Sequence, residues 1–115
     1  MHFIQLHELF DNLAGELFPF IDMIAERVTT LGGVAFGTAR MAAANSTLAE
    51  YPLTAIDGPA HLKALIVRFA EYSTAIRKAI DQADQHGDKA TADLFTEVSR
   101  TADKQLWFLE AHCQA

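Results

Sequence analysis

Apolar side chains recur every three or four positions over the first 30 residues, the spacing that gathers them on one side of an α-helix. Gly32 and Gly33 follow, and glycine most readily takes the left-handed backbone conformation that ends a helix. The pattern therefore predicts one helix over residues 3–30. Its apolar stripe consists of Leu6, Leu9, Phe10, Leu13, Leu17, Ile21, Ile24 and Val28.

The helical spacing is lost between residues 34 and 58, where small side chains predominate and Pro52 and Gly58 interrupt regular structure. Within this stretch, residues 38–44 are able to form a short helix whose first turn is capped by the hydroxyl of Thr38. We therefore expect a long crossover that contains one short helix.

The second half of the chain predicts two more long helices, over residues 59–86 and 89–112. Asp57 is placed to cap the first of them, and Pro59 stands in its first turn, where a missing N–H costs little. Asp88 is a natural cap for the second. Because the link between them is very short, the two helices must pack antiparallel. Their stripes are Leu62, Leu65, Phe69, Tyr72, Ile76 and Ile80 in the first, and Phe95, Val98, Ala102, Leu106 and Leu109 in the second.

Three long helices joined by one short link and one long crossover are typical of a helical bundle with a crossover connection. No stretch of the sequence competes as a strand, and no internal repeat is present. The 115 residues fit a single domain over 1–115, near the size at which association with other subunits commonly supplements a small core. We therefore expect an all-α domain with a partner surface.

The net charge of −6 and the pI of about 5.2 leave no positive field that would draw the chain to nucleic acid or anionic lipid. The basic residues are scattered among acidic ones and form no stripe, so the sequence does not support direct DNA binding. An acidic balance suits metal cations better.

The compartment is indicated by three features of the sequence. Cys113 is the one cysteine, which excludes an intrachain disulfide. No apolar run reaches the roughly 20 residues that span a bilayer, and the start at Met1 lacks the basic segment of a signal peptide. We expect a soluble, cytoplasmic protein with no membrane partner.

Four potential metal ligands, His7, Asp11, Asp22 and Glu26, share one side of the first predicted helix. With about 100° of rotation per residue and His7 taken as zero, the others fall near about 40°, about 60° and about 100°. Asp11 and Asp22 are nevertheless separated by roughly 16 Å along the helix axis, at a rise of about 1.5 Å per residue. One helix therefore cannot bring all four to one metal ion.

A second copy of the same helix removes this difficulty. If two such helices cross antiparallel about a two-fold axis near Glu16 and Leu17, the His7 and Asp11 of one subunit meet the second pair of its partner. Imidazole and carboxylate donors suit iron, and they also accept zinc or manganese. The alternative is that these side chains merely decorate the solvated side of an amphipathic helix.

Six short motifs spread along the chain, HFIQLHELFD (2–11), DMIAER (22–27), LGGVAFGT (31–38), EYPL (50–53), TADL (91–94) and DKQLWFLE (103–110), carry a family resemblance. Together they resemble the Dps mini-ferritins over essentially the whole chain. The resemblance implies a ferritin-like four-helix bundle, assembly into a hollow twelve-subunit shell, and ferroxidase centres at dimer interfaces. The implied function is oxidation of ferrous iron with hydrogen peroxide and storage of the iron, which limits hydroxyl radicals and protects DNA under stress.

On this resemblance the family's catalytic and metal-binding roles fall on His7 and Asp11 from one subunit and on Asp22 and Glu26 from its partner. The family carries a further ligand histidine at the end of its first bundle helix, and this sequence holds neither that helix nor that histidine. Pro19, between the two ligand pairs, is expected to bend the helix. We expect an N-terminally truncated Dps domain with a weakened site. The alternative is a structural paralogue that assembles through its helices without oxidising iron.

Other polar and aromatic residues carry weaker predictions. In the resembling family, acidic side chains near the junction of the last two helices line pores through which iron enters, although capping and a solvated turn explain them equally well. The remaining histidines have no ligand partner at metal spacing and are expected at surface or hydrogen-bonded positions. Trp107 and Phe108 are expected in the core. The acidic residues are Asp81, Asp84, Asp88 and Asp93, and the histidines are His61, His86 and His112.

Overall fold

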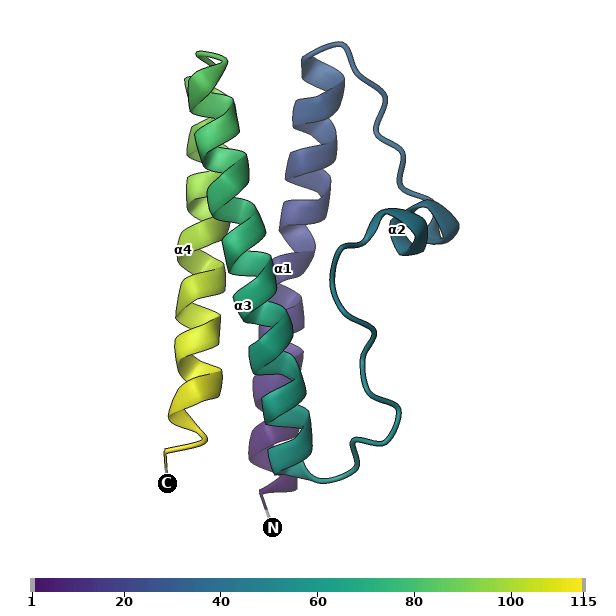
Figure 1. Ribbon diagram of the computed structural model, residues 1–115, viewed down its shortest axis with the longest axis vertical. Coiled ribbons are helices and arrows are strands. Elements are labelled where there is room, and N and C mark those ends of the chain that lie inside the picture. The colour runs from purple at the N-terminus through teal and green to yellow at the C-terminus, as the bar shows by residue number, and fades with distance from the viewer. Residues whose placement is uncertain (1, 115) are drawn as a thin grey trace.

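The computed structural model describes residues 2–114, which form three long helices and one short one (Figure 1). No strand occurs within these residues. The predicted helices are confirmed, and each boundary lies within one residue of its expected position. The helices are α1 (Phe3–Thr30), α2 (Ala39–Asn45), α3 (Gly58–Gln85) and α4 (Lys89–Ala111).

The sequence signals at the helix ends act as predicted. The side chains of three capping residues accept backbone N–H groups that the first turn of a helix leaves unpaired. α1 and α3 are followed by glycines with positive φ, Gly32 at 87° and Gly87 at 73°, a conformation that a side chain would strain. The capping residues are Thr38, Asp57 and Asp88, which accept from Met41, Ala60 and Thr91 at 3.3, 2.9 and 3.0 Å.

α1 and α3 run in the same direction, because the crossover of residues 31–57 returns the chain to the end at which α1 began (Figure 1). α4 runs the opposite way, packs along α3 and also contacts α1. The three long helices thus fill three corners of a four-helix bundle, with α1 and α3 on a diagonal. No helix of the described residues occupies the fourth corner, between α1 and α3 and opposite α4.

Two apolar clusters fill the space among the three long helices, and each draws residues from all three. Val98 and Leu109 of α4 are fully buried, which makes α4 the helix that holds the other two together. Leu17 of α1 packs against both clusters. The first cluster consists of Leu13, Leu62, Phe69 and Leu109, and the second of Phe20, Ile76 and Val98.

Two polar contacts fix α1 against α4. Near the middle of α1, the buried Gln105 side chain donates from Nε2 to the carbonyl oxygen of Leu13 at 3.1 Å. At its C-terminal end, Arg27 donates from Nη2 to Asp88 Oδ1 at 3.0 Å and from Nε to Thr91 Oγ1 at 2.9 Å. Arg27 therefore binds the residue that caps α4. The carboxylate of Asp88 thus both caps α4 and holds α1 against it.

Pro19 does not interrupt α1, which stays helical from Phe3 to Thr30. Proline removes the N–H that would bind the carbonyl of Gly15 four residues back and crowds that carbonyl. Both residues are exposed, and apart from the adjacent backbone of α1 and the two neighbouring residues, no atom lies within 4 Å of the position that a Cβ on Gly15 would take. The open surroundings leave room for the helix to adjust.

The prediction that Trp107 belongs to the core is wrong, because 62% of its surface is exposed. Ala102 and Leu109 define the buried side of α4, and at about 100° per residue Trp107 lies about 140° away from Ala102. Phe108, whose ring centroid is 5.0 Å from that of Trp107, is half-buried. The aromatic pair thus lies largely on the outer surface of α4.

Large apolar side chains are exposed in greatest number on α1 and on the crossover. Despite this apolar surface, none of the helices formed by residues 2–114 is long and apolar enough to cross a membrane. The exposed side chains are Phe3, Ile4, Phe18 and Ile21 on α1, and Leu31, Val34, Phe36, Leu48, Leu53 and Ile56 on either side of α2.

Candidate metal centre

His7 and Asp11 form the first of the two predicted ligand pairs, one turn apart near the start of α1. The His7 Nε2 and Asp11 Oδ2 atoms are 3.5 Å apart, and the two side chains are 57% and 70% exposed. The ring of Phe3 stacks on the imidazole with centroids 5.6 Å apart. The His7–Asp11 pair is therefore held by contacts within α1 and is open to solvent.

Asp22 and Glu26 form the second pair, also exposed, on the same side of α1 and nearer its C-terminal end. The apolar neighbours of Asp22 do not enclose it, because Phe18 and Ile21 are themselves 73% and 67% exposed. The carboxylate of Asp22 is therefore open to solvent in one chain. Across residues 2–114, no three histidine, cysteine or acidic side chains lie close enough together to hold a metal ion.

The surface between the two pairs carries small and apolar side chains. At the level where a crossing was predicted, Leu17 is half-buried and packs against both core clusters. Gly15 and Phe18 are exposed there instead, with open space around Gly15. A glycine beside an exposed aromatic ring permits close approach of another backbone and offers apolar surface to it. The crossing near Glu16 and Leu17 stays a prediction, and Gly15 and Phe18 are exposed residues at that level.

The acidic residues near the junction of α3 and α4 have different surroundings. Asp88 is half-buried and engaged: hydrogen bonds from the side chain and backbone of Thr91, and then the nearby Arg27, hold the pKa of its carboxyl below the usual range. Asp81, Asp84 and Asp93 are exposed. The capping explanation is therefore confirmed for Asp88, whereas the other three remain free to face a partner or solvent.

His61 is a hydrogen-bonded residue, as predicted. Its Nδ1 atom lies 2.6 Å from the hydroxyl of Tyr51, and the two rings stack with centroids 5.8 Å apart. Burial raises the pKa of the Tyr51 hydroxyl, against the smaller opposing effect of Arg68. His86 is exposed, and the ring of His112 lies 2.7 Å from the carbonyl oxygen of Phe108.

The sequence reasoning missed the residues that pin the crossover to α3. The guanidinium of Arg68 donates to the carbonyl oxygens of Ala49 and Glu50, and it lies over the ring of Tyr51, 5.5 Å from the centroid. The backbone N–H of Ala49 in turn donates to Glu71 at 3.3 Å. The motif at residues 50–53 was the only available signal, because hydrogen bonds to backbone carbonyls leave no spacing pattern in a sequence.

Comparisons with known proteins agree with this architecture. A family model described as the ferritin-like domain matches residues 1–115. The solved structure of DpsC from Streptomyces coelicolor superposes with a TM-score of 0.93 at 38% identity, over 100% of this chain and 67% of that one. The chain therefore belongs to the ferritin-like helical bundles.

Within that class the relatives are more specific. A DNA protection during starvation protein from Agrobacterium fabrum is 48% identical over 112 residues, which are 97% of this chain and 69% of that protein. The fine tangled pili major subunit of Haemophilus ducreyi is 33% identical over 110 residues, 96% of this chain and 58% of that protein. The chain is a member of the Dps family of mini-ferritins and spans roughly two thirds of the length of such relatives.

Proposed function

We propose that this chain oxidises ferrous iron, stores the ferric product, and by doing so protects DNA during stress. The observation that carries the proposal is the exposed side of α1. Two pairs of potential iron ligands lie there on either side of an apolar patch, and neither pair is sufficient to bind iron alone. The name of the Agrobacterium fabrum relative, DNA protection during starvation protein, supports the physiological part.

The proposed catalytic unit is a two-fold dimer of antiparallel α1 helices. His7 and Asp11 of one subunit supply an imidazole and a carboxylate, and Asp22 and Glu26 of the other supply two carboxylates. The antiparallel crossing makes both ends of the interface equivalent, so a dimer holds two such sites. Phe18 at the centre adds apolar burial that one chain lacks. We further propose that such dimers build the hollow twelve-subunit shell in which iron is stored.

The donor set fits iron as a substrate. Carboxylates and imidazole bind ferrous and ferric iron, and zinc and manganese compete for the same donors. Hydrogen peroxide is the proposed oxidant: two ferrous ions each give up one electron, and peroxide with two protons becomes two waters. Because both electrons come from bound iron, no hydroxyl radical leaves the site. The net charge of −6 favours the approach of cations, and Asp81, Asp84 and Asp93 are candidates for the surface by which they enter.

The activity is tested by combining Asp22→Ala with Glu26→Ala, which leaves each site with one imidazole and one carboxylate. Oxidation of ferrous iron with peroxide, followed by absorbance, should fall by about 10- to 100-fold toward the protein-free rate. Glu97→Ala combined with Glu110→Ala is the matched control, because it removes two exposed carboxylates of α4, away from the proposed interface, and should keep the parent rate. A ligand variant as fast as the parent would overturn the assignment even with the fold intact.

The dimer geometry has its own test by cysteine crosslinking in a Cys113→Ser background. A mixture of Asp11→Cys chains and Asp22→Cys chains should form crosslinked dimers far more readily than Asp11→Cys chains alone, because an antiparallel crossing brings position 11 to position 22. Nonreducing electrophoresis measures the yield. The reverse ranking would exclude the two-fold site.

A structural role without iron oxidation is the second candidate, and one observation favours it. The Haemophilus ducreyi relative, which is 33% identical over 110 residues, carries the name of a pilus subunit. For the present chain, assembly that is insensitive to the ligand variants, together with iron oxidation at the protein-free rate, would favour this role over the first.

A further inference from the structure

Phe3 and His7 lie one turn apart at the start of α1, and their rings are stacked. The ring centroids are 5.6 Å apart and the ring planes are inclined by 9°. Side chains of a helix lean toward its N-terminus, so the imidazole of His7 is carried onto the turn that Phe3 begins. One face of the imidazole is therefore covered by an aromatic ring, although Phe3 itself is 72% exposed.

The imidazole of His7 has few other contacts that fix its plane. Within residues 2–114, the hydrogen bonds of histidine rings belong to His2, His61 and His112. The Nε2 atom of His7 is 3.5 Å from Asp11 Oδ2, which is longer than a strong hydrogen bond. Rotation of a histidine ring about χ2 is soft, and metal-binding histidines usually donate their second ring nitrogen to an acceptor that fixes the ring. At His7 the stack is the contact able to take the place of that hydrogen bond.

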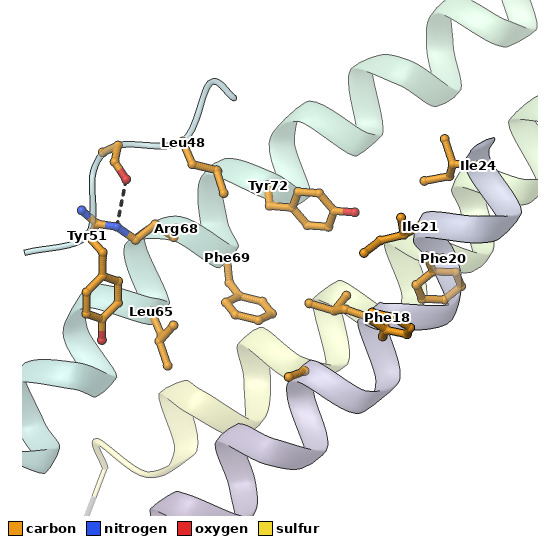
Figure 2. A pocket seen from close by; sticks show the side chains of 13 residues that line it. Phe18, Phe20, Ile21, Ile24, Leu48, Tyr51, Leu65, Arg68, Phe69 and Tyr72 are labelled. Carbon is orange, nitrogen blue, oxygen red and sulfur yellow. Dashed lines mark hydrogen bonds between the residues drawn. The ribbon is translucent and has the colours of Figure 1, made fainter. Parts of the chain in front are cut away.

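His61 is the other histidine whose ring is recorded as stacked on an aromatic side chain, and it is held in a different way. Its Nδ1 atom lies 2.6 Å from the hydroxyl of Tyr51, with the two rings inclined by 20°. Tyr51 is in turn beside Arg68, which donates to the carbonyl oxygen of Ala49 (Figure 2). Phenylalanine has no polar atom, so a stack on it uses neither ring nitrogen. The imidazole of His7 is thus oriented without the use of a nitrogen that a metal ion needs.

The stacked orientation turns the Nε2 atom of His7 toward Asp11. Two donor atoms that each lie about 2.1 Å from one metal ion are at most about 4.2 Å apart. The observed separation of 3.5 Å between Nε2 and Oδ2 therefore allows both atoms to bind the same ion. Because the lone pair of Nε2 lies in the plane of the ring, rotation out of the stacked plane would turn it away from that ion.

We propose that Phe3 is a positioning residue for His7, the proposed iron ligand: its ring holds the imidazole plane so that Nε2 stays beside Asp11 before iron binds. This role rests on the proposed function and deepens it. A side chain already held in its bound orientation loses less rotational freedom when the ion arrives. The gain in affinity from one such side chain is about three- to tenfold.

The orientation of the ring is tested in the metal-free chain by NMR of the histidine ring protons. A stacked aromatic ring shields the protons that lie over its face. Phe3→Leu keeps an apolar side chain without a ring and should move the His7 signals downfield, and Phe3→Tyr should return them to the parent positions. His86, exposed at the opposite end of the molecule, is the internal control and should keep its signals. His7 signals that stay in place in Phe3→Leu overturn the proposal.

The consequence for the site is measured with Zn²⁺, which the same donors accept. Calorimetry should show that Phe3→Leu weakens Zn²⁺ binding by about three- to tenfold and that Phe3→Tyr restores it to within about twofold of the parent. Phe36→Leu is the matched control, because Phe36 lies in the crossover and is 73% exposed, against 72% for Phe3. It should change the affinity less than about twofold. Equal weakening by the two leucine variants contradicts a specific role of the ring on His7.

Iron oxidation separates positioning from the chemical step. Bound iron itself holds the imidazole, so Phe3→Leu should raise the KM for ferrous iron by about three- to tenfold and leave kcat within about twofold of the parent. A lower kcat with an unchanged KM would assign Phe3 to the chemical step and overturn the proposal.

Failure of the iron site and failure of the stack give different results. If the parent chain neither binds Zn²⁺ nor oxidises iron, the proposed function fails, and the His7 signals still show whether Phe3 fixes the ring. Because the stack lies within one chain, these signals also decide for a variant that no longer dimerises, which sedimentation velocity detects. If the parent oxidises iron and Phe3→Leu matches it in KM and in the His7 signals, the positioning role alone is wrong.

Discussion

The α3–α4 hairpin and α1 have equally regular apolar stripes, but they differ in how much of the stripe is buried within the chain. α3 and α4 bury six residues each, whereas α1, as long as α3, buries only Leu13 and Phe20. Much of the remaining apolar surface of α1 lines two hollows between α1 and α3 or lies beside the ligand pairs. An apolar stripe that the chain itself covers only in part thus indicates a surface that other elements or subunits must cover.

The largest expected effect separates these two regions by their contribution to stability. Leu109→Ala removes a fully buried side chain between α4 and its neighbours and should lower the free energy of unfolding by about 2–5 kcal/mol. Ile21→Ala removes a side chain that is 67% exposed and should change it by no more than about 0.5 kcal/mol. Urea denaturation followed by circular dichroism measures both. Comparable losses would mean that α1 is already covered in solution.

A smaller effect is expected where the two regions meet, at Gln105. Its Nε2 atom donates to Leu13 O, while its Oε1 atom is buried without a partner among the described residues. Gln105→Met keeps the volume and removes both atoms, so the lost hydrogen bond and the relieved oxygen should nearly cancel, within about 1 kcal/mol. Gln105→Ala adds a cavity and should cost about 2–3 kcal/mol. A costly methionine variant would show that the contact to Leu13 fixes α1 in place.

The smallest effect concerns the contact of Asp88 with Arg27 and is visible in its pH dependence. Because the pKa of Asp88 is lowered in the fold, its stabilisation is complete above the unfolded pKa of about 3.9 and is lost as pH falls through the folded value. Asp88→Asn keeps a capping side chain but not the charge. Its Tm should be lower than the parent's at about pH 7, and the gap should close below about pH 4.

The control for this pH series is Asp81→Asn, which changes an exposed carboxylate on α3. Thermal melts of this variant should follow those of the parent at every pH. A gap for Asp88→Asn that stays constant down to about pH 2.5 would mean that geometry, and not charge, joins α1 to the α3–α4 turn.

The helices and their ends could be predicted from the sequence because the signals that specify them are local. Thr38, Asp57 and Asp88 cap their helices within three residues, and Gly87 ends one within the same short range. Such signals act through backbone N–H groups and φ angles next to them in the chain. No distant contact has to be known.

The candidate site could be predicted only in part, because its surroundings depend on contacts between residues that are distant in the sequence. The shared side of α1 that holds His7 and Glu26 follows from helical rotation alone, but the surroundings of Asp22 depend on packing that spacing does not encode. The prediction of Trp107 in the core did not use its angle on α4, which points outward. Arg68 bonds to backbone carbonyls, whose positions depend on the path of the crossover.

The long crossover also sets an order of events in folding. α3 and α4 are joined by a tight turn and meet through contacts close in sequence, whereas α1 reaches α4 through pairs such as Leu13 with Gln105, 92 positions apart. Closing so large a loop costs entropy before any contact repays it, and local contacts form sooner. The hairpin is therefore expected to form first and α1 to dock last. α1, which carries the ligand pairs and exposed apolar surface, is therefore expected to detach more readily than the rest of the chain. A partner that binds α1 would act on the last step of folding.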